Sequence, residues 1–503
     1  MRVLSWLLLG VNLGCVRALS VRREGDLVEK RAETITFNNP AAKQFYVDGA
    51  KLPLVPFDAG PSYAGLLPIS SDPNETRKLF FWFWPTNNPA NVKNLMFWTN
   101  GGPGCSAFQG LLEENGPISW NWGQAGPTPN PWTWTNLSNM LWVEQPVGTG
   151  FSQGTPNITN EDQLADQLIG FMQQFLNVFD ELKGNDFWVT GESYGGFYVP
   201  YIASHIYADP SALDLKLKGI FISDPSITYP IVQKEIPALR FVQANKNLMP
   251  LNSTYMRSLQ KISDTCGFTN YLDKYLKYPP KGPIPLPKGS FTKTYRAHKK
   301  CALNQRIMDA TTLINPAFDQ YRVTDMWPID WSVLGFPRAI EKFVYFNRTD
   351  VQDAIHAPHV KWEACATPPV FNETANHNSS FGINGGKDGD SSVPSALSVL
   401  PGVIEKSERV VIVHGLEDFS FMPEGTRIAI QNMTWEGKQG FQTPIKPESF
   451  TRKNMGVLGN AHTERKLTYV EFYFSGHMTP QFVPWAAYQT VEYLLGMRDS
   501  PSS

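Results

Sequence analysis

The stretch FWVTGESYGGFYVP, from Phe187 to Pro200, limits the possible folds of this chain more than any other. It sets a Gly-x-Ser-x-Gly pentapeptide between a strand-like apolar run and a helix-like run. A serine in so sharp a strand-to-helix turn takes a strained backbone, and small neighbours let the strand and the helix pass closely. The first amides of the helix then point toward the serine oxygen. The pentapeptide alone is common by chance, but with these flanks it predicts that Ser193 is a nucleophile.

A serine nucleophile needs a basic histidine and a carboxylate that orients it, and behind such a turn they follow in the order serine, acid, histidine. His477 follows the strand-like run YVEFYFSG, and Asp418 follows RVVIVHG. Glu417 is the alternative to Asp418 as the orienting carboxylate. The other histidines fit these roles less well: we expect His414 in the core, and solvated positions for His356, His359, His377 and His462.

The apolar runs alternate between strand and helix patterns. LFFWFWPT, NLMFWTN and NMLWVEQP are typical of buried strands, and residues 161–183 place apolar side chains at helical spacing behind Asn160, a plausible cap. The alternation resumes after residue 400 and ends in the helical pattern PWAAYQTVEYLLGM. Strands that alternate with helices predict an α/β fold with a central, mostly parallel sheet flanked by helices.

A region of different character interrupts this alternation. Residues 231–330 contain short helical patterns and the proline-rich run YPPKGPIPLPKGS, which Cys266 and Cys301 bracket. We interpret it as an inserted, largely helical cap region with its own disulfide. The predicted core is then formed by residues 32–230 and 331–503.

The N-terminus is typical of a processed, secreted protein. Residues 1–18 combine a basic start, a short apolar run and small residues at a cleavage site, as in a signal peptide. Residues 19–31 end in Lys30-Arg31 and predict a pro-segment that is removed after Arg31. No later apolar run is long enough to span a membrane. We expect export from the cell rather than delivery to a vacuole.

Export gives the sequons and cysteines a meaning. Asn-x-Ser/Thr sequons predict surface glycans at Asn74, Asn136, Asn157, Asn252, Asn347, Asn372, Asn378 and Asn432. Cys15 leaves with the signal peptide, so four cysteines remain, and an oxidising compartment predicts two disulfides with three possible pairings. No Cys/His spacing suits a metal site, and we expect no cofactor. The formal charge of −2 argues against nucleic acid and anionic membranes as partners.

Four long motifs together resemble the serine carboxypeptidase family of the α/β-hydrolase superfamily, in its fungal secreted type. They are WTNGGPGCSAFQGLLEENGP (98–117), VEQPVGTGFS (143–152), GESYGGFYVP (191–200) and GHMTPQFVP (476–484). Three positions depart from the family pattern: Glu144 replaces a usual aspartate, Leu416 replaces the first aspartate of a Gly-Asp-x-Asp run, and FISDPSIT (221–228) replaces a Gly-Asn-Gly turn.

The resemblance implies that Ser193 attacks the last peptide bond, His477 transfers the proton and Asp418 orients His477. It also implies an oxyanion hole formed by the N–H groups of Gly102 and Tyr194. On sequence alone, however, NGGPG is a tight surface turn.

Recognition of a free C-terminal carboxylate is implied for Trp98, Asn100, Gly101, Glu114 and Glu192. Two glutamates near an anion are reasonable only if they share a proton, which raises a pKa and predicts peptidase activity at acidic pH. From the residues alone, Glu114 is a solvated helix residue and Glu192 a polar spacer.

The family pattern further implies the disulfides Cys105–Cys365 and Cys266–Cys301. Met478 either lines the pocket of the leaving residue or packs in the core.

The chain is therefore predicted to be a secreted carboxypeptidase that acts on peptides and proteins with a free C-terminus. The alternatives are an esterase or acyltransferase on the same scaffold, and a binding protein without activity. The sequence leaves the side-chain preference and the oligomeric state open.

Overall fold

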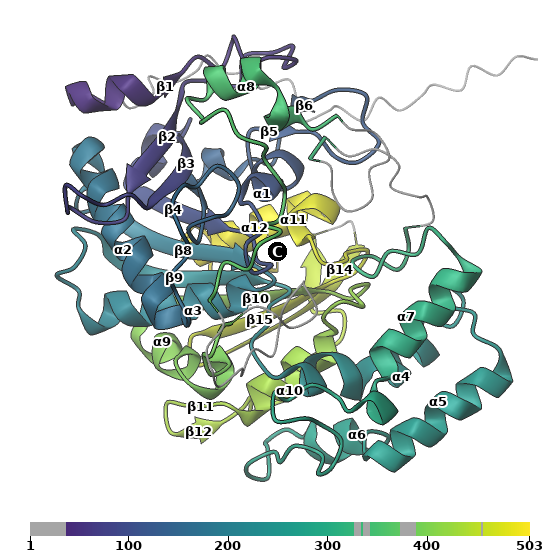
Figure 1. The fold of residues 1–503 in the computed structure, drawn as a ribbon. Helices are drawn as coiled ribbons and strands as arrows, with labels where there is room; N and C mark the ends of the chain where they lie inside the picture. The colour runs from purple at the N-terminus through teal and green to yellow at the C-terminus, as the bar shows by residue number, and fades with distance from the viewer. Residues whose placement is uncertain (1–36, 326–332, 335–342, 373–388, 454–455, 503) are drawn as a thin grey trace, which may run out of the picture.

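The computed structural model describes residues 37–325, 333–334, 343–372, 389–453 and 456–502. The predicted signal peptide, pro-segment and Cys15 lie outside these residues. Figure 1 shows one large sheet through the middle of the molecule, with helices on both sides. No helix among the described residues is long and apolar enough to cross a membrane.

The sheet has eleven strands and is mixed. Its spatial order is β1-β2-β3-β7-β4-β8-β9-β10-β15-β14-β13. The six strands from β7 to β15 in this order are parallel, and the strands at both edges are antiparallel. The strands are β1 (Tyr46–Val47), β2 (Ser62–Pro68), β3 (Lys78–Trp84), β4 (Asn94–Thr99), β7 (Asn139–Glu144), β8 (Asp186–Glu192), β9 (Lys216–Ser223), β10 (Arg409–Gly415), β13 (Phe450–Arg452), β14 (Gly456–Glu464) and β15 (Leu467–Phe472). Two small hairpins pair β5 (Ile118–Ser119) with β6 (Thr128–Pro129) and β11 (Thr434–Trp435) with β12 (Lys438–Gln439).

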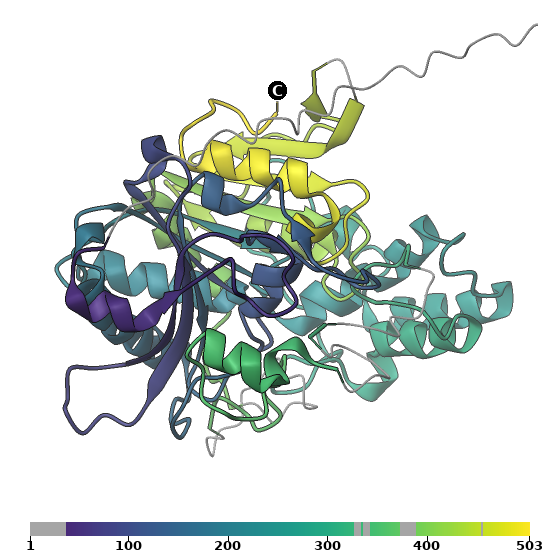
Figure 2. The ribbon, with the colours of Figure 1, turned by 90° about the horizontal axis from the view of Figure 1, so that it is seen from above.

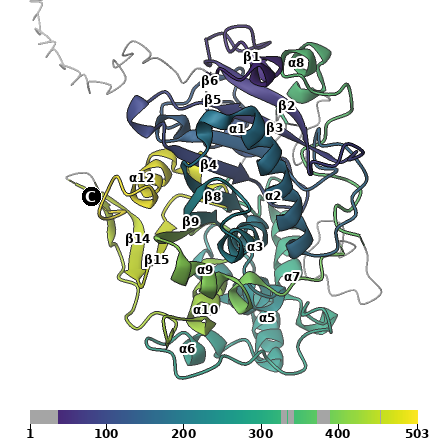
Figure 3. The ribbon, with the colours of Figure 1, turned by 90° about the vertical axis from the view of Figure 1, so that its left-hand side faces the viewer.

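The aromatic strand β3 shows why the sheet is buried on both faces. Its side chains alternate between two cores: Phe81 and Phe83 pack into one, and Phe80, Trp82 and Trp84 pack into the other. The first core is covered by α2 (Glu161–Val178), α3 (Gly195–Ala208) and α9 (Leu400–Lys406). The second is covered by α1 (Phe108–Glu113), α8 (Thr349–Ala354) and α12 (Pro484–Leu494). Figure 3 shows α2 and α3 in front of the sheet, and Figure 2 shows the yellow helix α12 beside it.

Helix α2 begins where the sequence predicts. The side chain of Asn160 accepts a hydrogen bond from Gln163 N at 2.9 Å, as an N-cap does. The helix ends at Val178, and a short 3₁₀ turn, Asp180–Leu182, completes the predicted range.

Between β9 and β10 lies a helical region with its own core. It contains α4 (Ile236–Ala244), α5 (Ser253–Cys266), α6 (Tyr271–Tyr275) and α7 (Leu303–Ile314). Their apolar side chains form a third cluster, which also includes Phe419 and Ile428. Phe419 precedes α10 (Pro423–Asn432), and Ile428 lies on it. In Figure 2 these teal helices lie to the right of the sheet. The disulfide Cys266–Cys301 joins the end of α5 to the segment before α7.

Candidate active site

The turn after β8 carries Ser193 in a left-handed backbone conformation, with φ of 60°. This is the strained geometry that the pentapeptide predicts. Ser193 N donates to Ser223 O at 2.9 Å, and Ser193 O accepts from Ser226 N at 2.8 Å, so β9 and the segment after it hold the turn. Helix α3 begins at Gly195, which directs its N-terminal end toward the serine.

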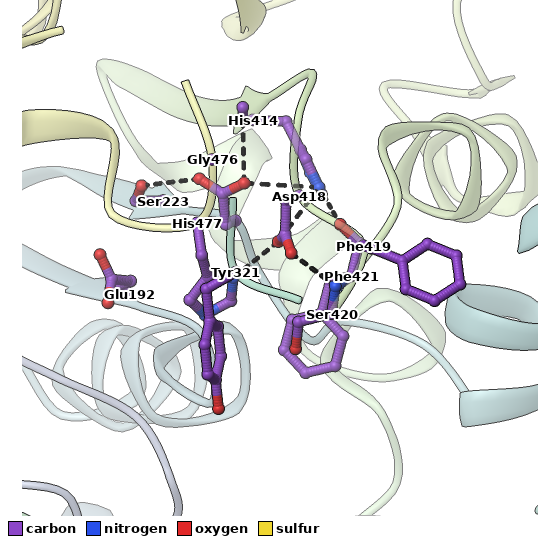
Figure 4. Close-up of polar contacts among 12 residues, drawn as sticks. Glu192, Ser223, Tyr321, His414, Asp418, Phe419, Ser420, Phe421, Gly476 and His477 are labelled. Atoms are coloured by element: carbon purple, nitrogen blue, oxygen red, sulfur yellow. Dashed lines mark hydrogen bonds and ion pairs between the residues drawn. The ribbon is translucent and has the colours of Figure 1, made fainter. Parts of the chain in front are cut away.

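His477 and Asp418 come together although 59 residues separate them. His477 Nδ1 lies 2.6 Å from Asp418 Oδ2, and both side chains are buried. Asp418 Oδ1 accepts hydrogen bonds from Ser420 N at 2.7 Å and Phe421 N at 3.1 Å, which fix the carboxylate (Figure 4). Ser193 and His477 both line one cavity of ≈ 520 Å³. The arrangement can therefore activate a serine hydroxyl.

Glu417, the alternative orienter, faces elsewhere. Its Oε2 atom accepts hydrogen bonds from Thr324 Oγ1 and, at 3.3 Å, from Arg322 Nε. The structure thus places Asp418, and not Glu417, against His477.

The rings of Tyr321 and Phe421 flank the histidine. Their centroids lie 5.2 Å and 5.6 Å from the centroid of the His477 ring, and the three side chains lie together in Figure 4. Tyr321 O also accepts a hydrogen bond from His477 N at 2.7 Å. No sequence pattern pointed to these two aromatic residues.

The loop NGGPG is not the surface turn that the sequence alone suggests. It packs against the serine turn so closely that a Cβ on Gly101 would lie 2.2 Å from Tyr194 N. Gly101 and Gly102 line the cavity with Ser193. The disulfide Cys105–Cys365 is present, in the pairing that the family resemblance implies, and Ser106 N donates to Ala364 O at 2.8 Å beside it. The loop and the serine turn therefore line the same cavity side by side.

Asn100 lines the cavity and organises a buried polar cluster beside it. Its Oδ1 atom accepts hydrogen bonds from Trp98 Nε1 at 2.8 Å and Gly110 N at 3.1 Å. Two donors at the oxygen fix the orientation of the amide, so that Nδ2 faces Glu114 Oε1 at 3.1 Å and Glu192 Oε1 at 3.2 Å.

The two glutamates of this cluster are buried, with exposed fractions of 4% for Glu114 and 3% for Glu192. The expectation of a solvated Glu114 and of Glu192 as a mere spacer was therefore wrong. Burial raises the pKa of Glu114. Burial and the charge of Glu114 raise the pKa of Glu192 well above its usual value. A carboxyl pair of this kind is able to retain a proton and donate it in a hydrogen bond.

Burial also affects Glu113, which neighbours Glu114 on α1. It raises the pKa of Glu113 to about 8. The sequence does not indicate this burial, because it depends on which parts of the fold pack against the helix.

Asp224 is a further acidic residue next to the catalytic pair. Its Oδ1 atom accepts a hydrogen bond from Gly415 N at 2.9 Å and lies 3.5 Å from His414 Nε2. Burial, followed by the charge of Asp418, raises the pKa of Asp224 well above its usual value. Asp224 belongs to FISDPSIT, the run that departs from the family pattern.

Asp224, Asp418 and His477 offer ligand atoms within 4.8 Å of one another. Their oxygens, however, already accept hydrogen bonds from backbone amides and from His477, and the cluster fits acid–base chemistry better than metal binding. His414 is fully buried, as expected, and its Nε2 atom lies 2.6 Å from Phe421 O (Figure 4).

The histidines that we expected in solvated positions differ in their exposure. His356 and His359 are exposed, as the sequence predicts, and His377 lies outside the described residues. The expectation for His462 was wrong: it sits on β14 with 12% of its side chain exposed and pairs with Glu464 at 3.0 Å. Met478 is buried yet lines the cavity, so both alternatives for this residue describe it in part.

Glu144, one of the departures from the family pattern, has a definite structural role. Glu144 is buried and accepts hydrogen bonds from Ser106 Oγ at 2.5 Å and Trp362 Nε1 at 2.7 Å, so it connects the segments that carry Ser106 and Trp362.

The exposed sequon asparagines are Asn74, Asn157, Asn252 and Asn372. Asn136, Asn347 and Asn432 are partly buried, and Asn378 lies outside the described residues. Asn347 Nδ2 donates a hydrogen bond to Trp362 O at 3.0 Å.

Comparison with known proteins agrees with this geometry. A family described as "Serine carboxypeptidase" matches residues 55–496. A probable serine carboxypeptidase of Arthroderma benhamiae is 44% identical, over 94% of this chain and 90% of the relative. Serine-type carboxypeptidase F of Aspergillus niger is 38% identical, over 93% and 90% of the two chains. The crystal structure of Kex1(delta)p, a prohormone-processing carboxypeptidase from Saccharomyces cerevisiae, superimposes with a TM-score of 0.70 at 22% identity, over 92% of this chain and 99% of that chain.

Proposed function

Because this chain belongs to the serine carboxypeptidase family, we propose that it releases single C-terminal residues from peptides at acidic pH through an acyl-enzyme on Ser193. The family establishes a serine-type carboxypeptidase and peptide substrates. The catalytic residues, the pH range and the export of the protein are our proposal.

In the proposed mechanism, His477 takes the proton of the Ser193 hydroxyl as the oxygen attacks the last peptide carbonyl. Asp418 keeps the imidazole in the tautomer that accepts this proton and stabilises the imidazolium. The N–H groups of Gly102 and Tyr194 hold the oxyanion, and His477 then protonates the leaving amine. A water molecule, deprotonated by His477, hydrolyses the acyl-enzyme.

One observation carries the proposal for a free C-terminus. The Asn100 amide contacts both Glu114 and Glu192, which directly precedes the nucleophile, and both carboxyls are buried. With the shared proton, the pair donates a hydrogen bond to the substrate carboxylate beside the Asn100 amide and the Gly101 N–H. When the pair loses that proton, it repels the same carboxylate.

Blocked dipeptides with a free or an amidated C-terminus, assayed between about pH 4 and 7, test this proposal, because burial raises the pKa of both carboxyls above the ordinary value of a glutamate. We expect cleavage of the free acids alone, with KM rising toward neutral pH. Equal cleavage of amidated peptides would contradict the exopeptidase proposal. Rapid hydrolysis of simple esters combined with inert peptides would instead favour the esterase or acyltransferase alternative.

Export and processing are proposed from residues 1–31 and the sequons. The exposed positions of Asn74, Asn157, Asn252 and Asn372 support glycosylation. N-terminal sequencing of protein recovered from the medium should begin at Ala32, and glycosidase treatment should lower its apparent mass. A mature protein that begins elsewhere would contradict cleavage after Arg31.

A further inference from the structure

The cavity around Ser193 is lined by two chemically different regions. One end is the Asn100 cluster described above. The other is formed by residues that precede or belong to the helical region, namely Pro230, Lys234, Glu235, Arg296, Asn304 and Met308. Lys234 lies on a π-helical turn, Ile231–Glu235, that leads into α4. Such turns occur often at functional sites.

Lys234 lies near the catalytic histidine and has no acidic partner. Its Nζ atom is 4.7 Å from the centroid of the Phe421 ring, and this ring lies 5.6 Å from that of His477. Among the described residues, no carboxylate oxygen lies within 4.0 Å of Nζ. Burial lowers the pKa of Lys234, and the charges of Asp418 and Glu235 offset this only in part.

The neighbouring acidic residue, Glu235, is hydrogen-bonded to the backbone. Glu235 Oε2 accepts hydrogen bonds from Leu303 N at 2.6 Å and Asn304 N at 2.9 Å, at the start of α7. This carboxylate therefore stabilises the first turn of α7. Arg296 also lines the cavity.

The direction of the substrate places this region on the acyl side. With its terminal carboxylate at Asn100 and its scissile carbonyl at Ser193, a peptide extends its preceding residue away from the Asn100 cluster.

We infer that Lys234, with Arg296 beside it, forms a cationic subsite that selects an acidic side chain, Asp or Glu, in the residue before the scissile bond. The inference rests on the proposed function, because it uses the substrate direction given there. A substrate carboxylate supplies the partner that Lys234 lacks, in a cavity where such a contact is stronger than in water.

Blocked dipeptides with Glu, Gln, Leu or Lys before a C-terminal Phe test the subsite at about pH 5.5, where a glutamate side chain is ionised. For the native enzyme we expect kcat/KM for Glu to exceed that for its isostere Gln by about tenfold, as for one partly desolvated ion pair. Lys234→Met should bring this ratio near one, whereas Lys234→Arg should keep the preference. Lys246→Met, at an exposed lysine, is the matched control.

An equal Glu-to-Gln ratio in the native enzyme and in Lys234→Met would overturn the inference. So would a preference that depends on an acidic leaving residue instead, measured with Phe-Glu and Phe-Gln peptides. Calorimetric binding of blocked glutamate and blocked glutamine to Ser193→Ala separates the subsite from catalysis. Tighter binding of blocked glutamate that is lost with Lys234→Met supports the subsite even if the peptidase proposal fails, and equal binding of both compounds refutes it.

Discussion

Glu192 and Glu114 lie at the buried end of the cavity with one amide group, Asn100 Nδ2, between them at 3.2 Å and 3.1 Å. Because both carboxyls are buried and close to each other, ionisation of both is unfavourable, and the pKa of Glu192 is well above its usual value. The pair is thus in its uncharged or singly charged form in acid. This relationship explains how two acidic residues are able to serve an anionic substrate.

The first prediction concerns Glu192→Gln. Glutamine donates a hydrogen bond at every pH, so KM should rise less with increasing pH than in the native enzyme, in which the pair becomes ionised and repels the substrate carboxylate. Steady-state kinetics with a blocked dipeptide measures KM. An unchanged dependence of KM on pH would show that another group titrates.

The second prediction separates Asp418 from its neighbour. Asp418→Asn should lower kcat by about 10³–10⁴-fold, because an amide cannot hold the productive histidine tautomer. Glu417→Gln is the matched control and should have a small effect, since Glu417 contacts Thr324 and Arg322 instead of His477. Comparable losses in both variants would reject Asp418 as the orienting residue.

The third prediction concerns the contact between the NGGPG loop and the serine turn. Gly101→Ala adds a Cβ that lies 2.2 Å from Tyr194 N, so the loop must move and kcat/KM should fall by at least about tenfold. Gly402→Ala, on α9, places its Cβ in open space and serves as control. Native activity of Gly101→Ala would mean that the loop adapts without loss.

The fourth prediction is a loss of stability with rising pH. The pKa of Glu113 is raised to about 8, so its carboxyl binds a proton in the folded chain that the unfolded chain releases near its ordinary pKa. Its contribution is complete below about pH 4 and decreases as pH rises toward 8. Asp319 acts in the same direction, with a pKa of about 7.

Glu113→Gln should therefore retain more of its acid-pH free energy of unfolding at about pH 7.5 than the native protein does. Denaturant titrations at acidic and neutral pH measure this difference. Glu448→Gln, at an exposed position, should leave the native pH dependence unchanged. A free energy of unfolding that increases with pH in the native protein would contradict the assignment.

The fifth prediction distinguishes the two disulfides. Replacing Cys105 and Cys365 by alanine should mainly lower kcat/KM, because this bridge joins the NGGPG loop to the segment around Ala364. Replacing Cys266 and Cys301 should mainly lower stability, by about 3–4 kcal/mol, because it frees a closed loop within the helical region. Each double variant is the control for the other, and reversed effects would contradict both placements.

The sequence alone determined the features that depend on neighbours along the chain. The run around Ser193 specified a strand, a strained turn and a helix, and the apolar runs specified the buried strands. The order of Ser193, Asp418 and His477 was readable because strand ends precede each of them. The family motifs added the Cys105–Cys365 pairing.

Only the tertiary structure decided the features that depend on what surrounds a side chain. Glu114 and Glu192 meet at Asn100 from positions 14 and 92 residues away, and Asp224 meets His414 across two neighbouring strands. Their burial and pKa shifts follow from those meetings. The physical reason is that desolvation and Coulomb interactions depend on distances in space, which a local pattern of residue types does not encode.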